Sequence, residues 1–224
     1  MFLAFDTSTP WLTMALGDGE TIRFHLTVLT CRDHSRKLMA VLAHMKREGF
    51  FEEAVLQGIV VGRGPGSFTG VKIAMMVAGS LSYALHRPVF GYSSLEGLAS
   101  LVPEEMLLAI QCDRIVPIIL HKRNELFWSE FEPAYRRKSL DSLHIGSPTD
   151  CLQAIRGKRA LVVCPWPEYT KIFEKDGIQV YPPPFSIPDA RCLLALHHLR
   201  KDLSSEMEKA AGMVPIYGSQ VFTG

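Results

Sequence analysis

Short apolar runs and apolar residues at helical spacing alternate along the first half of the chain. Short apolar runs bounded by polar turns are typical of strands, whereas apolar positions three or four residues apart are typical of helices. Strands are therefore expected at 2–6, 12–16, 21–28, 56–61 and 88–92. Helices are expected at 33–49, at 69–86 and through 98–101, the last after a Ser93–Glu96 capping box. The order βββαβαβα indicates a mixed α/β lobe.

The second half loosely repeats this order after a break at Pro103. Strands are expected at 107–111, 116–120, 125–131, 160–163 and 178–181, and helices at 149–155, 167–174 and 187–200. We therefore expect a duplicated α/β lobe. Residues 1–102 would form the N-terminal lobe and residues 103–224 the C-terminal lobe, with the tail packing back on the first lobe.

A glycine-rich turn, GRGPGSFTG at 62–70, follows the apolar run 59–61 and leads into the helix expected at 69–86. Ser67 and Thr69 are candidate caps for that helix. Free N–H groups at a helix start can hold an anion; alternatively, the segment is a tight turn that binds nothing. A Walker A loop is excluded, because one residue too many separates the glycines and Lys72 does not follow Gly70 directly. The glycine spacing also misses the dinucleotide pattern by one residue.

The helix after this turn has almost no polar face. A helix that is apolar all round is buried on several sides. It is therefore either central in the domain, or packed with one face on the core and another on a partner. Small residues along it would let another helix approach closely, and Met75 and Met76 provide an adaptable surface.

Composition narrows the class of protein. The 224 residues are 47% hydrophobic, enough for one large domain or two small lobes. A net charge of +1 gives no strong footprint for nucleic acid. Five cysteines without a C-x-x-C motif indicate reduced thiols rather than a disulfide framework or a zinc site. No basic signal-peptide region precedes the first apolar run, and no run is expected to reach the length of a membrane span, so we expect a cytoplasmic protein.

The first strand ends in Asp6, Thr7 and Ser8 and is followed by a hairpin. This opening is typical of actin-like and ribonuclease-H-like nucleotide-binding lobes, in which such an aspartate orients a metal-bound water or a phosphate. The alternative is a turn-capping aspartate with its own backbone hydrogen bond. His34 and His44 are ten residues apart and do not form a metal-ligand pair on one helix face.

Several motifs together resemble one family, the bacterial TsaB (YeaZ) family of the actin-like ATPase superfamily. The matching segments are 2–9, His34-Ser35, the signature GPGSFTG, 89–98, 125–128, 187–196 and 215–217, and the signature residues are Gly64, Pro65, Gly66, Ser67, Phe68, Thr69 and Gly70. The sequence departs from the family pattern at Arg36, 71–74, 121–123, 164–167 and 218–219.

The resemblance implies two ribonuclease-H-like (actin-like ATPase) lobes with mixed sheets flanked by helices. It also implies a non-catalytic scaffold or activator subunit in the threonylcarbamoyladenosine modification of tRNA next to the anticodon. This subunit would bind a TsaD-like catalytic subunit, which a TsaE-like ATPase joins, and would form a homodimer when alone. It would meet tRNA only through the complex and would have no membrane partner. The adjacent His197 and His198 do not supply the histidine pair, four apart, that holds the metal of the catalytic relative.

The resemblance further places the partner surface on the helices 33–49 and 69–86. The interface residues expected on them are Leu38, Leu42, Met45, Val71, Met75, Ala78, Gly79 and Ser82. Asp6, Thr7 and Ser8 would be a degenerate nucleotide-binding site. No cofactor is expected to be required, although ATP or ADP could bind at the partner interface. The alternative function is a small actin-like ATP-dependent phosphotransferase or hydrolase that uses Asp6 and the Gly64–Gly70 loop.

Overall fold

The computed structural model describes residues 1–30, 33–50, 52–133, 142–200 and 215–216. The chain forms two compact units, one of Met1–Ser94 with Asp189–Ile216 and one of Leu95–Pro188. The C-terminal helix α7 (Ala190–Arg200) therefore belongs to the first unit, whereas the expected boundary at 102/103 had assigned it to the second lobe.

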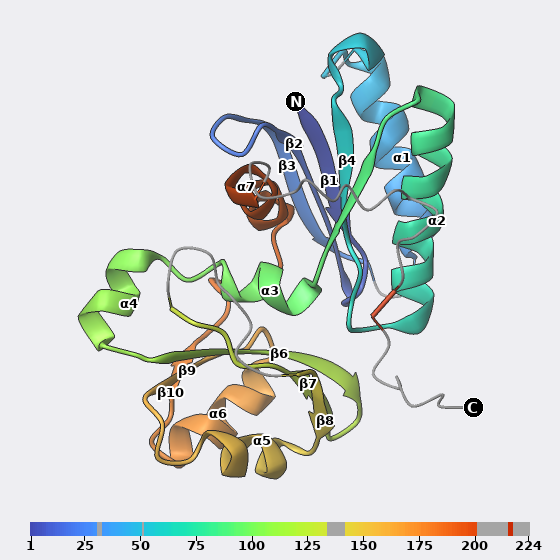
Figure 1. Ribbon diagram of the computed structural model, residues 1–224. Coiled ribbons are helices and arrows are strands. Elements are labelled where there is room, and N and C mark those ends of the chain that lie inside the picture. The colour runs from blue at the N-terminus through green and yellow to red at the C-terminus, as the bar shows by residue number, and fades with distance from the viewer. Residues whose placement is uncertain (31–32, 51, 134–141, 201–214, 217–224) are drawn as a thin grey trace. The chain divides into compact units, whose positions relative to one another are not determined.

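The first unit is built on a five-stranded mixed sheet of order β3-β2-β1-β4-β5 (Figure 1). Its strands are β1 (Phe2–Asp6), β2 (Trp11–Gly17), β3 (Ile22–Leu29), β4 (Gly58–Gly62) and β5 (Val89–Tyr92). The hairpins join β1, β2 and β3 antiparallel, whereas β4 and β5 run parallel to β1. Leu3 pairs with Leu16 on one side and with Ile59 on the other.

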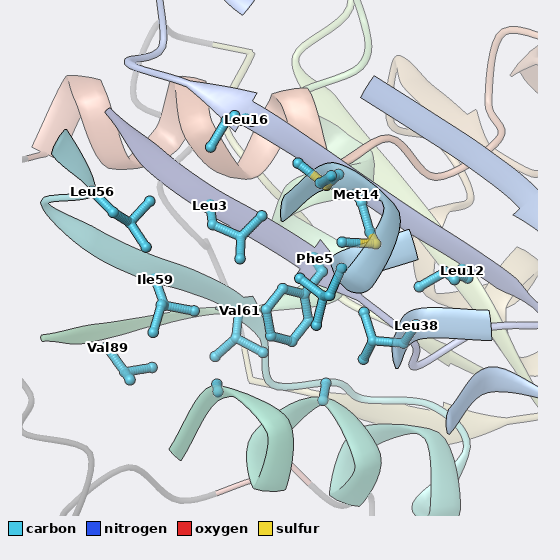
Figure 2. Packing of buried hydrophobic residues seen from close by; sticks show 14 residues of the cluster. Leu3, Phe5, Leu12, Met14, Leu16, Leu38, Leu56, Ile59, Val61 and Val89 are labelled. Atoms are coloured by element: carbon cyan, nitrogen blue, oxygen red, sulfur yellow. The ribbon is translucent and has the colours of Figure 1, made fainter. Parts of the chain in front are cut away.

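Alternation along β1 directs its side chains to two different helical layers. Leu3 and Phe5 face α1 (His34–Arg47) and α2 (Phe68–Leu85), which lie side by side on one face of the sheet (Figures 1 and 2). Ala4 faces α7 on the opposite face. A buried leucine or phenylalanine contributes about 1.5–3 kcal/mol relative to an exposed one, so both layers stabilise the unit.

The second unit repeats the strand order of the first. Its strands are β6 (Arg114–Lys122), β7 (Glu125–Trp128), β8 (His144–Gly146), β9 (Ala160–Val163) and β10 (Gln179–Tyr181). They lie in the order β8-β7-β6-β9-β10, again with an antiparallel hairpin layer and two parallel strands. The helices are α3 (Ser94–Ala99), α4 (Glu104–Ile110), α5 (Pro148–Ile155) and α6 (Pro167–Lys175), and a 3₁₀ turn η1 (Glu53–Val55) lies in the first unit. The expected fold class, two mixed α/β lobes, is confirmed.

One expected strand is wrong, because residues 107–111 lie mostly in helix α4. Pro103 occupies the N-cap position, and Glu104 and Glu105 in the first turn favour the helix dipole. Gln111 ends the helix in the left-handed conformation, with φ 50°. The short strand β8 was not expected, and of the matching tail segment 215–217 only residues 215 and 216 are described.

Helix α2 corrects the expectation about membrane-spanning length. By length and composition it is long and apolar enough to cross a membrane, the one such helix among the described residues. In the structure it instead packs on the first sheet through Val71, Ala74 and Ala78. Ile73, Val77 and Leu81 also pack against this core, whereas the large apolar side chains of Phe68, Met76 and Tyr83 remain exposed.

Candidate functional site

The signature loop joins β4 to α2 and packs against the end of β1. The Ser67 N–H donates to the Ser8 carbonyl at 2.7 Å, and the Thr7 hydroxyl donates to the Gly70 carbonyl at 2.7 Å. The Ser67 side chain accepts from the Gly70 N–H and caps α2, so Ser67 rather than Thr69 is the observed N-cap. The loop thereby fixes where α2 begins.

The glycines of this region are required by close approach of the chain at residues 6–8. A Cβ atom would lie 2.0 Å from Asp6 Oδ2 at Gly62, 2.2 Å from the Ser8 carbonyl at Gly66, and 1.9 Å from the Thr7 carbonyl at Gly70. No side chain fits at such distances. At Gly64 glycine is favoured for a different reason: its backbone has a φ of +87°, which residues with a side chain rarely adopt. The space against these glycines is occupied by the protein's own β1 end.

A buried hydrogen-bond network closes the site around Asp6. Asp6 Oδ1 accepts from the Ser8 N–H at 2.7 Å, which is the turn-capping arrangement, and Oδ2 accepts from the Ser94 hydroxyl at 2.6 Å. Ser94 Oγ in turn accepts from the Ser8 hydroxyl at 2.9 Å and the Gly64 N–H at 3.1 Å. Burial raises the pKa of Asp6 above its ordinary value, while the bonds from Ser94 and Ser8 oppose that rise.

His34 fastens the start of α1 to the same end of the sheet. Its Nε2 lies 2.8 Å from the Thr9 carbonyl and 2.9 Å from the Thr30 hydroxyl oxygen. Because a carbonyl only accepts, Nε2 carries the hydrogen in this arrangement. Asp33 occupies the N-cap position without capping the helix and pairs with Arg36 instead.

The two adjacent histidines of α7 have separate structural partners. His197 is buried, and its Nδ1 lies 3.1 Å from the Tyr92 hydroxyl. His198 Nδ1 lies 3.2 Å from the Asp18 carbonyl. Within the described residues, no group of three or more His, Cys, Asp or Glu is placed to hold a metal ion.

The structure divides the eight expected interface residues between the core and the helix flanks. Five of them, Leu38, Leu42, Met45, Val71 and Ala78, are buried in the core of the first unit. Figure 2 shows Leu38 pointing into this cluster. The side chains of these five residues pack in the core, so their part in a partner interface stays a prediction. Met75, Gly79 and Ser82 are half-buried on α2.

The apolar side chains that remain accessible on these helices are different ones. On α2, Phe68 is 56% exposed, Met76 71% and Tyr83 84%, and on α1, Met39 is 54% exposed. We call these four residues the exposed apolar face. Because nearly every position of α2 is apolar, its sequence gave no period by which to separate the core side from this face. In the structure, the burial of Val71, Ala74 and Ala78 identifies the side of α2 that packs on the core.

Part of one matching segment, residues 215 and 216, and two of the departures from the family pattern, at 164–167 and 121–123, have described positions. Ile216 donates its N–H to the Arg63 carbonyl at 2.8 Å, next to the signature loop (Figure 1). In the second unit, Cys164–Pro167 forms the turn into α6, where the Ser186 hydroxyl donates to the Cys164 carbonyl at 2.7 Å. His121 Nε2 lies 3.9 Å from Glu125 Oε2, and partial burial, together with the neighbouring Lys122, lowers the pKa of His121.

Comparison with known proteins agrees with this fold. Residues 28–137 match the family model of TsaD, tRNA N6-adenosine threonylcarbamoyltransferase. The chain is 26% identical to the TsaB tRNA threonylcarbamoyladenosine biosynthesis protein of Haemophilus influenzae over 96% of this chain and 92% of that protein. It is 35% identical to TsaB of Bacillus subtilis over 44% of this chain and 43% of that protein. The solved structure of YeaZ from Pseudomonas aeruginosa superposes with a TM-score of 0.74 at 22% identity, covering 96% of this chain and 98% of that chain.

The architecture of two units with like-ordered mixed sheets is thus the fold of the YeaZ structures. The resemblance expected from the sequence motifs is confirmed: curated relatives that carry the TsaB name and solved YeaZ structures are similar to most of this chain.

Proposed function

We propose that this chain is a non-catalytic partner subunit in the biosynthesis of threonylcarbamoyladenosine in tRNA, and that it binds a TsaD-like catalytic subunit. The relatives of the chain that carry the TsaB name are threonylcarbamoyladenosine biosynthesis proteins. The match of residues 28–137 to the TsaD family model supports an origin shared with such a subunit. A TsaE-like ATPase would join the pair in the cytoplasm, and tRNA would meet this chain only through the complex.

The observation that carries this proposal is the exposed apolar face of α1 and α2. Exposed aromatic and methionine side chains gathered on a helical layer are typical of protein–protein interfaces. Phe68, Met76 and Tyr83 stand on one helix whose other side is fixed to the sheet. The face is therefore held rigidly, which reduces the entropy lost on association.

Met76→Glu is expected to weaken binding of a TsaD-like subunit by about 100-fold or more, since a charge would be buried in an apolar interface. The fold should be unaffected, because Met76 is 71% exposed. Leu108→Glu on α4 is the matched control, an apolar helix residue 72% exposed in the other unit. Affinity would be measured by calorimetry, and folding by thermal unfolding. Equal affinities for the Met76 variant, the Leu108 variant and the natural chain would contradict the proposal.

Ala78 is unsuitable for this test, although its small side chain suggested a helix contact. It is only 1% exposed, so a glutamate there would unfold the first unit rather than report on a partner.

The geometry does not favour the alternative, a phosphotransferase or hydrolase. Both carboxylate oxygens of Asp6 accept hydrogen bonds within the chain, and the signature loop is packed against residues 6–8. We propose that the isolated chain requires no cofactor and that any ATP or ADP binds at the interface with the partner. Incubation of the isolated chain with Mg-ATP should give no turnover; turnover that is lost in Asp6→Asn would support the alternative instead.

A further inference from the structure

Lys72 is the charged residue within the exposed apolar face of α2. Its Nζ lies 4.0 Å from the centre of the Phe68 ring, one turn earlier on the helix, and Met76 follows one turn later. Side chains of a helix lean toward its N-terminus, which places the ammonium over the first turn of α2. The first turn itself carries partial positive charge from its N–H groups. Two positive sources therefore coincide at this end of the face.

No carboxylate on these two helices balances that charge. Neither α1, with sequence HSRKLMAVLAHMKR, nor α2, with sequence FTGVKIAMMVAGSLSYAL, contains an aspartate or glutamate. Among the described residues, no carboxylate forms an ion pair with Lys72.

Three other cations of the layer are paired with carboxylates at the ends of α1, and the Lys37 ammonium donates to the Leu29 carbonyl at 3.3 Å. Arg36 pairs with Asp33, Lys46 with Glu53 at 2.7 Å, and Arg47 with Glu48 at 2.9 Å. Lys72 is therefore distinguished by its position, because it is the cation that lies between the exposed side chains of Phe68 and Met76 on α2.

We infer that the partner of this face presents a carboxylate to Lys72, set between apolar side chains that cover Phe68 and Met76. This inference rests on the proposed function and deepens it, because it gives the chemistry by which the face selects its partner. An ammonium enclosed by a partner loses water and needs a carboxylate in exchange. The same lysine over an aromatic ring would keep part of its charge stabilisation through the cation–π contact.

A second copy of the chain fits this requirement poorly. Pairing of two such faces would bring together two helical layers that lack carboxylates, and each Lys72 would be enclosed without a counter-charge. The face therefore favours an unlike, acidic partner over a second copy, so the homodimer expected of the isolated chain should be the weaker of the two complexes.

Nucleic acid is a poorer occupant than an acidic protein. Phosphate-binding surfaces gather many unpaired cations, whereas three of the cations on α1, Arg36, Lys46 and Arg47, are paired with carboxylates. Met76 and Tyr83 are 71% and 84% exposed, and apolar side chains of a protein partner would bury them.

The test measures the affinity of the full chain for the TsaD-like subunit by calorimetry, with substitutions at Lys72. Lys72→Arg should bind within about twofold of the natural chain, Lys72→Met roughly tenfold weaker and Lys72→Glu about 100-fold weaker, because like charges across an interface are strongly unfavourable. Lys171→Glu is the matched control, an exposed lysine on α6 whose replacement changes net charge equally. It should bind as the natural chain does.

The outcomes separate this inference from the proposed function. If the natural chain binds the catalytic subunit and Lys72→Glu binds equally well, the acidic-partner inference fails and the proposed function stands. If the natural chain does not bind at all, the proposed function fails and the inference falls with it. Two other results would also overturn the inference. One is self-association of the isolated chain, measured by light scattering, as tight as its binding to the catalytic subunit. The other is direct tRNA binding that Lys72→Glu abolishes.

Discussion

Gly70→Ala is expected to destabilise the first unit by at least about 3 kcal/mol, at the upper end of the cost of overpacking. A Cβ atom at this position would lie 1.9 Å from the Thr7 carbonyl, and the obstructing atom is backbone that cannot rotate away. Separation of the two segments would also break the bond from the Thr7 hydroxyl to the Gly70 carbonyl, 2.7 Å long and buried. Urea unfolding of the two proteins would measure the difference.

Gly79→Ala is the matched control within the same helix. No atom lies within 4 Å of a Cβ at Gly79. Alanine has the higher helix propensity, so this variant should be more stable than the natural chain by about 0.5–1 kcal/mol. If Gly70→Ala and Gly79→Ala unfold at the same urea concentration, close approach is not the reason for glycine in the signature.

Two substitutions of Asp6 are expected to distinguish the stability that comes from its hydrogen bonds from the effect of its charge. Asp6→Ala leaves the Ser8 N–H and the Ser94 hydroxyl without their acceptor, and each buried donor costs about 1–3 kcal/mol. Asp6→Asn keeps an acceptor for the Ser8 N–H, and reversal of the hydrogen bond between the Ser8 and Ser94 hydroxyls would let Ser94 accept from the new amide group. Asp6→Asn should therefore be much closer in stability to the natural chain than Asp6→Ala.

The pH dependence tests the same site. Because burial raises the pKa of Asp6 from 3.8, the folded chain binds this proton more tightly than the unfolded chain does. Stability contributed by Asp6 is thus greatest at low pH, decreases as the pH rises above 3.8, and levels off above the folded pKa. The free energy of unfolding of the natural chain should fall relative to that of Asp6→Asn across this window. Parallel pH profiles would show that Asp6 does not titrate with a raised pKa.

The sequence predicted most elements of the fold because their apolar periods are regular. The hairpin strands and α1 follow the expected patterns closely. Helix α4 was missed because its single apolar run, centred on Leu107 and Leu108, is too short to show a period of 3.6. Its Pro103 and paired glutamates are the local signals that could have identified it.

The candidate site was only partly predictable, for a physical reason. The signature glycines are visible in the sequence, but their cause is the backbone of residues 6–8, some 60 positions away, which only the folded sheet brings against them. Likewise, the sequence of a helix that is apolar on every side, such as α2, does not indicate which side packs against the sheet. Both answers depend on tertiary contacts rather than local pattern.

The position of α7 determines the order in which the chain can complete its fold during synthesis. Residues 95–188 of the second unit form one continuous stretch of the chain, and parts of the first unit precede and follow it in the sequence. Ala4, Ala15 and Val60 pack against α7, so this face of the first sheet has no cover until about residue 200 has left the ribosome. The N-terminal half of the protein is therefore the last to become complete, and a fragment ending at residue 102 would carry an open apolar sheet face.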